Sequence, residues 1–191
     1  MQLAALGKIN NYLLSITTGI KRLKPSVLAK PTLLIALSFL GHPAFPATLG
    51  DQAPQFSLPQ LNNGHIVELT DYRGKVIYLD FWASWCPPCR VSIPEIESMQ
   101  KTLSNEDFEV LAINLDKDKH AARQFLKRFP VSYTVLSDIN GKVAKDYALP
   151  GMPTSYVVSK NGEVTMVHKG FKSGDMAKIS AHIKRLLHEN K

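Results

Sequence analysis

The segment Asp80-Phe81-Trp82-Ala83-Ser84-Trp85-Cys86-Pro87-Pro88-Cys89-Arg90 decides the fold, and it holds the only two cysteines of the 191-residue chain. Two cysteines separated by two residues can alternate between dithiol and disulfide without rearrangement of the backbone. Residues 76–82 (VIYLDFW) are β-branched, aromatic and apolar apart from one acid, which predicts a buried strand. After the second cysteine, apolar residues recur at helical spacing, at Ile93, Ile96, Met99 and Leu103. The segment therefore predicts a redox centre on a strand-to-helix turn.

The two thiols are expected to have different roles. Cys86 falls at or just before the first helical turn, where unpaired backbone N–H groups and the helix dipole stabilise an anion. We therefore expect it to ionise below the usual thiol pKa of about 8.5 and to be the exposed nucleophile. Cys89 lies one turn further along the same face, as the more sheltered resolving thiol. Pro87 and Pro88 suit a helix start because their φ is fixed and they lack N–H groups.

The run resembles the thioredoxin superfamily, and WCPPC resembles its TlpA/ResA-like branch of exported thiol–disulfide oxidoreductases. The likeness covers residues 50 to 189. It implies that Asp80 is the buried acid that takes a proton from the second cysteine. It also implies that Pro94 kinks the active-site helix and that Pro153 is a cis-proline facing the disulfide. A carboxyl group behind a buried strand has a raised pKa, so it can accept a proton near neutrality.

The chain also departs from the thioredoxin pattern. The lysine that pairs with the buried acid in thioredoxins is replaced by Ala112, so desolvation should dominate the pKa of Asp80. Ser92 stands where many relatives carry an acid. The turn before Pro153 should expose the backbone of Met152 to an extended substrate peptide, as in strand addition. We expect Trp85, Pro87, Pro88, Met152 and Pro153 to contact substrate, although Trp85 has simple packing as its alternative.

The first part of the chain looks like an export signal. Residues 1–47 hold five basic residues and no acid, and the apolar stretch 32–41 is too short to span a bilayer comfortably. We interpret 1–47 as a signal peptide or an uncleaved membrane anchor, with a mitochondrial presequence as an alternative. The other 18 basic residues and all 16 acidic ones lie in residues 48–191, a single domain with a net charge near +2. This balance argues against nucleic-acid binding.

The order of predicted elements indicates an α/β fold. A hairpin around residues 62–64 comes first, followed by alternating strands and helices, a second hairpin at 161–162 and a last helix lined by Met176, Ile179, Ile183 and Leu187. This order predicts a central mixed sheet flanked by helices. It matches a thioredoxin fold with an N-terminal β-hairpin extension and an inserted strand–helix unit. The cysteine turn should lie at the carboxyl end of a central strand.

These features favour a thiol–disulfide oxidoreductase that acts on proteins. The resemblance implies a periplasmic reductant for cytochrome c maturation or copper-site assembly, without a cofactor or a metal. It also implies a membrane electron donor of the DsbD/CcdA type, because the compartment is oxidising. We expect a monomer whose partners are protein thiols and disulfides.

Three alternatives stay open. The Cys86/Cys89 pair could bind Cu(I) in a metallochaperone-like module, with Met152 near the thiols. Residues 50–64 resemble the opening of peroxiredoxins, although Leu79 and Ala83 stand where those peroxidases need Pro and Thr or Ser. The pair could also form a purely structural disulfide, but so short a loop removes little chain entropy.

Overall fold

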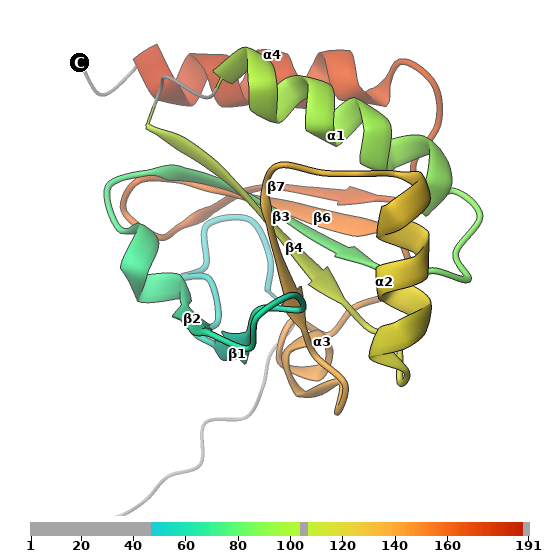
Figure 1. Cartoon of the computed structure of the whole chain (residues 1–191). Coiled ribbons are helices and arrows are strands. Elements are labelled where there is room, and N and C mark those ends of the chain that lie inside the picture. Colours follow the sequence, from blue (N-terminus) through green and yellow to red (C-terminus); the bar gives the residue numbers. More distant parts are fainter. Residues whose placement is uncertain (1–46, 104–106, 189–191) are drawn as a thin grey trace, which may run out of the picture. The chain divides into compact units, whose positions relative to one another are not determined.

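The computed structural model describes residues 47–103 and 107–188. The predicted leader, apart from Ala47, lies outside these residues. A mixed five-stranded sheet in the order β5-β4-β3-β6-β7 forms the centre of the described part (Figure 1). β3 is parallel to β4, β4 is parallel to β5, and β6 and β7 run antiparallel. The strands are β3 (Val76–Trp82), β4 (Phe108–Asn114), β5 (Thr134–Ser137), β6 (Thr154–Val158) and β7 (Val164–Lys169).

Helices cover both faces of the sheet, so the predicted α/β architecture is confirmed. In Figure 1, α1 and α4 lie together on one face, whereas α3 and the β1–β2 hairpin lie on the other. Alternate residues of β3 separate the two sides: Tyr78 and Trp82 belong to the cluster under α1 and α4, and Leu79 and Phe81 belong to the opposite cluster. The helices are α1 (Cys89–Leu103), α2 (Lys119–Arg128), α3 (Lys142–Asp146) and α4 (Asp175–His188).

The helices form where the apolar spacing predicts them. The four apolar residues expected to line α1 and the four expected to line α4 are all buried. Asp118 caps α2 by accepting a hydrogen bond from the backbone N–H of His120 at 2.8 Å. α2 ends at Arg128, and Phe129 is its C-cap residue. There its ring still packs against Phe125, with 4.8 Å between centroids.

The N-terminal hairpin and the inserted unit are also present. β1 (Ser57–Pro59) pairs antiparallel with β2 (Ile66–Glu68), and a short 3-10 helix, η1 (Leu69–Tyr72), follows. α2 and β5 form the inserted unit between β4 and α3. The hairpin reaches this unit because the N–H of Leu61 donates to the carbonyl of Val135 at 2.8 Å. The outer edge of β5 is thereby covered, which prevents unwanted strand pairing there.

Within residues 47–103 and 107–188, no helix has the length and apolar character needed to cross a bilayer.

Candidate active site

The two cysteines are joined by a disulfide on the turn between β3 and α1. The Sγ atoms of Cys86 and Cys89 are 2.05 Å apart and the Cα atoms are 5.3 Å apart. The N–H of Cys86 donates to the carbonyl of Ala83 at 3.1 Å, which holds the chain in a tight turn after the strand. β3 is the middle strand of the sheet, and its parallel neighbour β4 ends at the same edge. The pair therefore lies at the carboxyl end of a central strand, as predicted.

The backbone N–H groups near Cys86 are less available than the sequence suggested. Pro87 and Pro88 have none to offer, and the N–H groups of Cys89, Arg90 and Val91 donate to the carbonyls of residues 86, 87 and 88 at 3.1–3.2 Å. The expectation of unpaired donors around the nucleophile is therefore wrong for this disulfide form. A tight i→i+3 turn leads into α1 and uses them. The helix dipole remains as the source of anion stabilisation at this end.

The two sulfurs differ in access, but neither residue is exposed. Only 2% of Cys86 and 0% of Cys89 are accessible to solvent. The expectation of an exposed nucleophile is therefore wrong for this form. Cys86 nevertheless lines a surface groove, whereas Cys89 does not. The predicted order of accessibility, with Cys89 the more sheltered residue, is confirmed.

The groove next to Cys86 is large and mostly apolar. It has a volume of about 960 Å³. Four of the five predicted substrate contacts line it: Trp85, Pro87, Pro88 and Met152. Trp85 is 63% exposed, so it is not a packing residue. The far wall was not predicted, since it comes from segments distant in sequence. It consists of Leu115, Ala144, Lys145, Ala148, Leu149 and Gly151.

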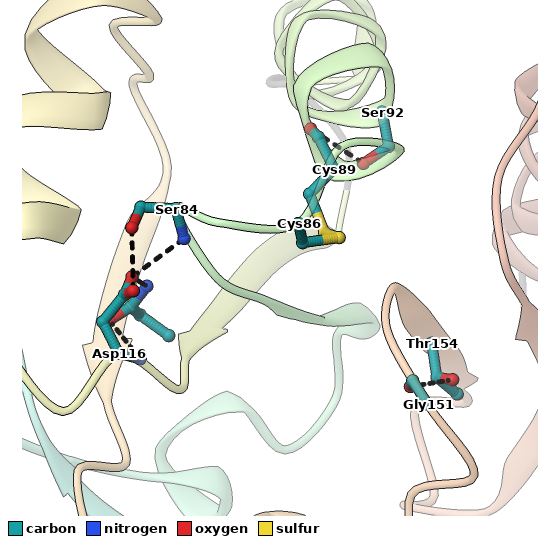
Figure 2. Close-up of a disulfide and its surroundings, with 8 residues drawn as sticks. Ser84, Cys86, Cys89, Ser92, Asp116, Gly151 and Thr154 are labelled. Atoms are coloured by element: carbon teal, nitrogen blue, oxygen red, sulfur yellow. Dashed lines mark hydrogen bonds between the residues drawn. A yellow bond between two sulfur atoms is a disulfide. The ribbon is translucent and has the colours of Figure 1, made fainter.

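The turn before β6 lies across from the disulfide in Figure 2. The Met152–Pro153 peptide bond is cis, as the resemblance implies. Pro153 itself is buried and does not line the groove, so the fifth predicted substrate contact lies beneath the surface. The hydroxyl of Thr154 donates to the carbonyl of Gly151 at 2.8 Å and fixes the turn (Figure 2). Gly151 and Met152 are the residues of this turn that line the groove, and Met152 is the one with a side chain.

Asp80 is a buried acid, and no cationic side chain of the described residues pairs with it. It is 1% exposed, and its Oδ2 has no hydrogen-bond partner among the described residues. Its neighbour on β4 is Ala112, in register, and its neighbour on β6 is Ser155. Burial raises the pKa of Asp80 to about 7, as the missing lysine predicted. On β3 it lies two residues from both Tyr78 and Trp82 and therefore on the same face, which is the face of the layer that contains Cys89.

A second carboxylate, which the sequence analysis missed, holds the loop before the disulfide. Asp116 accepts hydrogen bonds from the backbone N–H of Ser84 at 2.9 Å and from its hydroxyl at 2.8 Å (Figure 2). The side-chain amide of Asn114 also donates to Asp116 at 2.7 Å. Asp116 is 3% exposed, so this network ties the end of β4 to the active-site loop in a nearly dry environment. An acid just after a buried strand was the only hint in the sequence.

Two further predicted positions lie on α1. Pro94 is inside the helix, where the resemblance places its proline. Ser92, at the position that is acidic in many relatives, is buried and donates to the carbonyl of Cys89 at 3.3 Å (Figure 2). Among the described residues, no group of three or more His, Cys, Asp or Glu side chains is placed to hold a metal ion.

Comparison with known proteins agrees with this site. The family model described as Redoxin matches residues 48–182. The thiol-disulfide oxidoreductase ResA of Geobacillus kaustophilus is 30% identical over 158 residues, which cover 78% of this chain and 90% of the relative. ResA of Bacillus subtilis is 30% identical over 152 residues, with coverages of 75% and 84%. The crystal structure described as thiol:disulfide interchange protein DsbE from Chlorobium tepidum shares 41% identity. The matched region covers 73% of this chain and 98% of the Chlorobium tepidum chain, with a TM-score of 0.70.

The fold and the Cys86–Cys89 pair together define a thiol–disulfide oxidoreductase with a thioredoxin fold. The chain belongs to the Redoxin family and, within the thioredoxin superfamily, to the TlpA/ResA-like group. It is an enzyme of the ResA and DsbE type. These relatives favour the oxidoreductase over the Cu(I) module and the peroxidase.

Proposed function

We propose that this protein is an exported reductant of protein disulfides, of the kind that serves cytochrome c maturation or copper-site assembly in the periplasm. One observation carries the proposal: Cys86 opens onto an apolar groove while Cys89 lies behind it, next to a layer that holds an unpaired acid. A groove that leads to one sulfur admits an extended chain and directs its disulfide to that sulfur. The likeness to ResA and DsbE supports thiol–disulfide exchange as the reaction.

The reaction begins from the dithiol form of the enzyme. The Cys86 thiolate attacks one sulfur of the substrate disulfide, so the substrate S–S bond breaks and one substrate thiolate leaves. A mixed disulfide now joins Cys86 to the substrate. The Cys89 thiolate then attacks the Cys86 sulfur and displaces the second substrate thiolate. The enzyme ends as the disulfide seen here, two electrons have passed to the substrate, and two protons end on its thiols.

Asp80 is the proton acceptor for the second step. With a pKa of about 7, it is partly ionised near neutral pH and can take the proton of the Cys89 thiol. Because no cation within residues 47–103 and 107–188 neutralises it, its ionised form is costly, and proton transfer from the thiol restores the neutral acid. Trp85, Pro87, Pro88 and Met152 line the groove, and they contact the bound substrate there.

The reductant must be recharged from outside the periplasm. We place this role with a membrane electron donor of the DsbD/CcdA type, which would reduce the Cys86–Cys89 disulfide by the reverse sequence of exchanges. Residues 1–47 would direct export, either as a cleaved signal peptide or as an uncleaved anchor. The acid-free composition of this segment supports the export role.

The proposal is tested by trapping. Cys89→Ala leaves Cys86 without its resolving thiol, so the mixed disulfide with the physiological substrate should accumulate in cells. Mass spectrometry of the non-reduced adducts then identifies the substrate. The matched control is the Cys86→Ser/Cys89→Ala double variant, which should trap nothing. Adducts formed by the double variant, or none formed by the single variant, would contradict the proposed roles.

The direction of flow has its own measurement. Alkylation of thiols in acid-quenched cells reports the fraction of Cys86–Cys89 that is reduced in the cell. For a reductant, that fraction should be large and should collapse when the membrane donor is deleted. A pair that stays oxidised whether or not the donor is present would refute the reductant role.

A further inference from the structure

The groove continues well beyond the reactive sulfur. Its far wall is formed by Leu115, by α3 residues Ala144 and Lys145, and by Ala148 and Leu149 just after α3. A single cysteine side chain bound at Cys86 leaves this part empty. The occupant must carry the disulfide that Cys86 attacks, so it is the substrate itself, and more of the substrate than its cysteine must lie in the groove.

The chemistry of the far wall is selective. Among the described residues that line the groove, Lys145 is the only charged one, and the rest of the wall is apolar. Lys145 is exposed, and no ion pair joins it to another residue in the described part of the chain. Lys142, one turn earlier, pairs with Asp146 instead. An apolar trough with one unpaired cation favours an apolar group followed by an anion.

The backbone at Ala148 supports a role for its side chain. Ala148 follows the C-cap of α3 and has a φ of 46°, in the left-handed region. Glycine is the usual residue at this position after a helix, because a Cβ atom is disfavoured there. The methyl group of Ala148 is therefore present against the local backbone preference, and it lines the groove. Strained residues of this kind gather at binding sites.

From these observations, we infer that the α3 wall selects substrates by sequence. The preferred substrate is an extended segment whose disulfide cysteine lies within a few residues of a large apolar side chain, with a carboxylate beyond it. The cysteine lies at Cys86, the apolar side chain rests against Ala148 and Leu149, and the carboxylate meets Lys145. This inference rests on the proposed reductase activity and specifies its substrate class.

Pre-reduced enzyme and a set of synthetic peptide disulfides provide the test. Each peptide releases a fluorophore when its disulfide is reduced, and single-turnover rate constants are compared. Replacing the apolar residue of the peptide by serine should lower the rate constant about tenfold, since one buried apolar side chain is lost. This applies whether the apolar residue precedes or follows the cysteine of the peptide. Replacing the carboxylate residue by lysine should lower it about fivefold, as expected for an exposed ion pair that turns into a repulsion.

Two variants on the same helix separate local recognition from net charge. Lys145→Gln removes the cation from the groove. Peptides with the carboxylate residue should then react less than about twofold faster than peptides with lysine in its place. Lys142→Gln removes the same charge outside the groove and should keep the preference. Ala148→Gly removes one methyl contact, so it should lower about threefold the rate advantage of peptides with the apolar residue over peptides with serine in its place. It should not lower the melting temperature of the enzyme by more than a few degrees.

The outcomes distinguish the inference from the proposed function. Wild-type enzyme that reduces neither the peptides nor a small aromatic disulfide such as dithiodipyridine fails as a reductase. If it reduces every peptide at the same rate, the reductase activity stands and the selection by the α3 wall is wrong. Equal loss of the charge preference in Lys145→Gln and Lys142→Gln would assign that preference to net charge and overturn the role of Lys145.

Discussion

Replacing Asp80 by asparagine should change how stability depends on pH. Burial raises the pKa of Asp80 from 3.8 to about 7 in the folded protein. Between these values the folded state holds a proton that the unfolded chain has released, so stability is complete below the unfolded pKa and falls as pH rises through the folded pKa. One pKa unit corresponds to about 1.4 kcal/mol, so raising the pH from about 5 to 8 should cost wild type about 3 kcal/mol from this group.

The Asp80→Asn variant lacks this titration. Its amide introduces a constant cost for an unpaired buried group, but that cost does not vary with pH. Denaturant unfolding of the oxidised proteins is measured across this pH range. The free energy of unfolding of the variant, relative to that of wild type, should rise by about 3 kcal/mol from the acidic to the alkaline end. Asp118→Asn is the matched control, because Asn caps a helix as well as Asp does, and it should follow wild type. Parallel curves for wild type and Asp80→Asn would refute a buried acid that titrates near neutrality.

Three further outcomes are expected. In rapid-mixing experiments, Asp80→Asn should slow the attack by Cys89 on the mixed disulfide about tenfold or more and leave the first attack, by Cys86, nearly unchanged. Equal slowing of both steps would contradict the role of Asp80 as the proton acceptor for Cys89. Asp116→Ala should lower the free energy of unfolding by about 2–4 kcal/mol, because the N–H of Ser84 and other buried donors lose their acceptor. Urea titration measures this loss, and a loss below about 0.5 kcal/mol would show that the hydrogen bonds to Asp116 are dispensable. Tyr147→Phe should cost about 1 kcal/mol, since its hydroxyl donates to a backbone carbonyl of the N-terminal segment at 3.0 Å; an unchanged unfolding midpoint would show that water replaces that bond.

The features that the sequence predicts best are those encoded by neighbouring residues. The strand before Cys86 and the helix after Cys89 follow from local spacing and composition, and the structure confirms them. The desolvated state of Asp80 also follows, because the residue opposite it in the adjacent strand could be identified as Ala112 from the resemblance.

The features that the sequence does not predict depend on segments that only the fold brings together. The hydrogen bonds between Asp116 and Ser84 join residues 32 positions apart in the sequence. The far wall of the groove comes from Leu115 and from residues between 144 and 151. No local pattern encodes these meetings. The occupied N–H groups around Cys86 were missed for another reason: helical spacing predicts that a helix starts there, but not that a tighter turn precedes it.

The shelter around the disulfide sets the kinetics of electron exchange. Thiol–disulfide exchange needs the attacking sulfur to approach along the axis of the S–S bond. Cys89 is fully enclosed and Cys86, which lines the groove, is only 2% exposed, so a thiol must fit the groove beside Cys86 to react there. In the role proposed above, this protein can then work beside an oxidising catalyst without exchanging electrons with it, since shape complementarity, rather than redox potential alone, decides which pairs react.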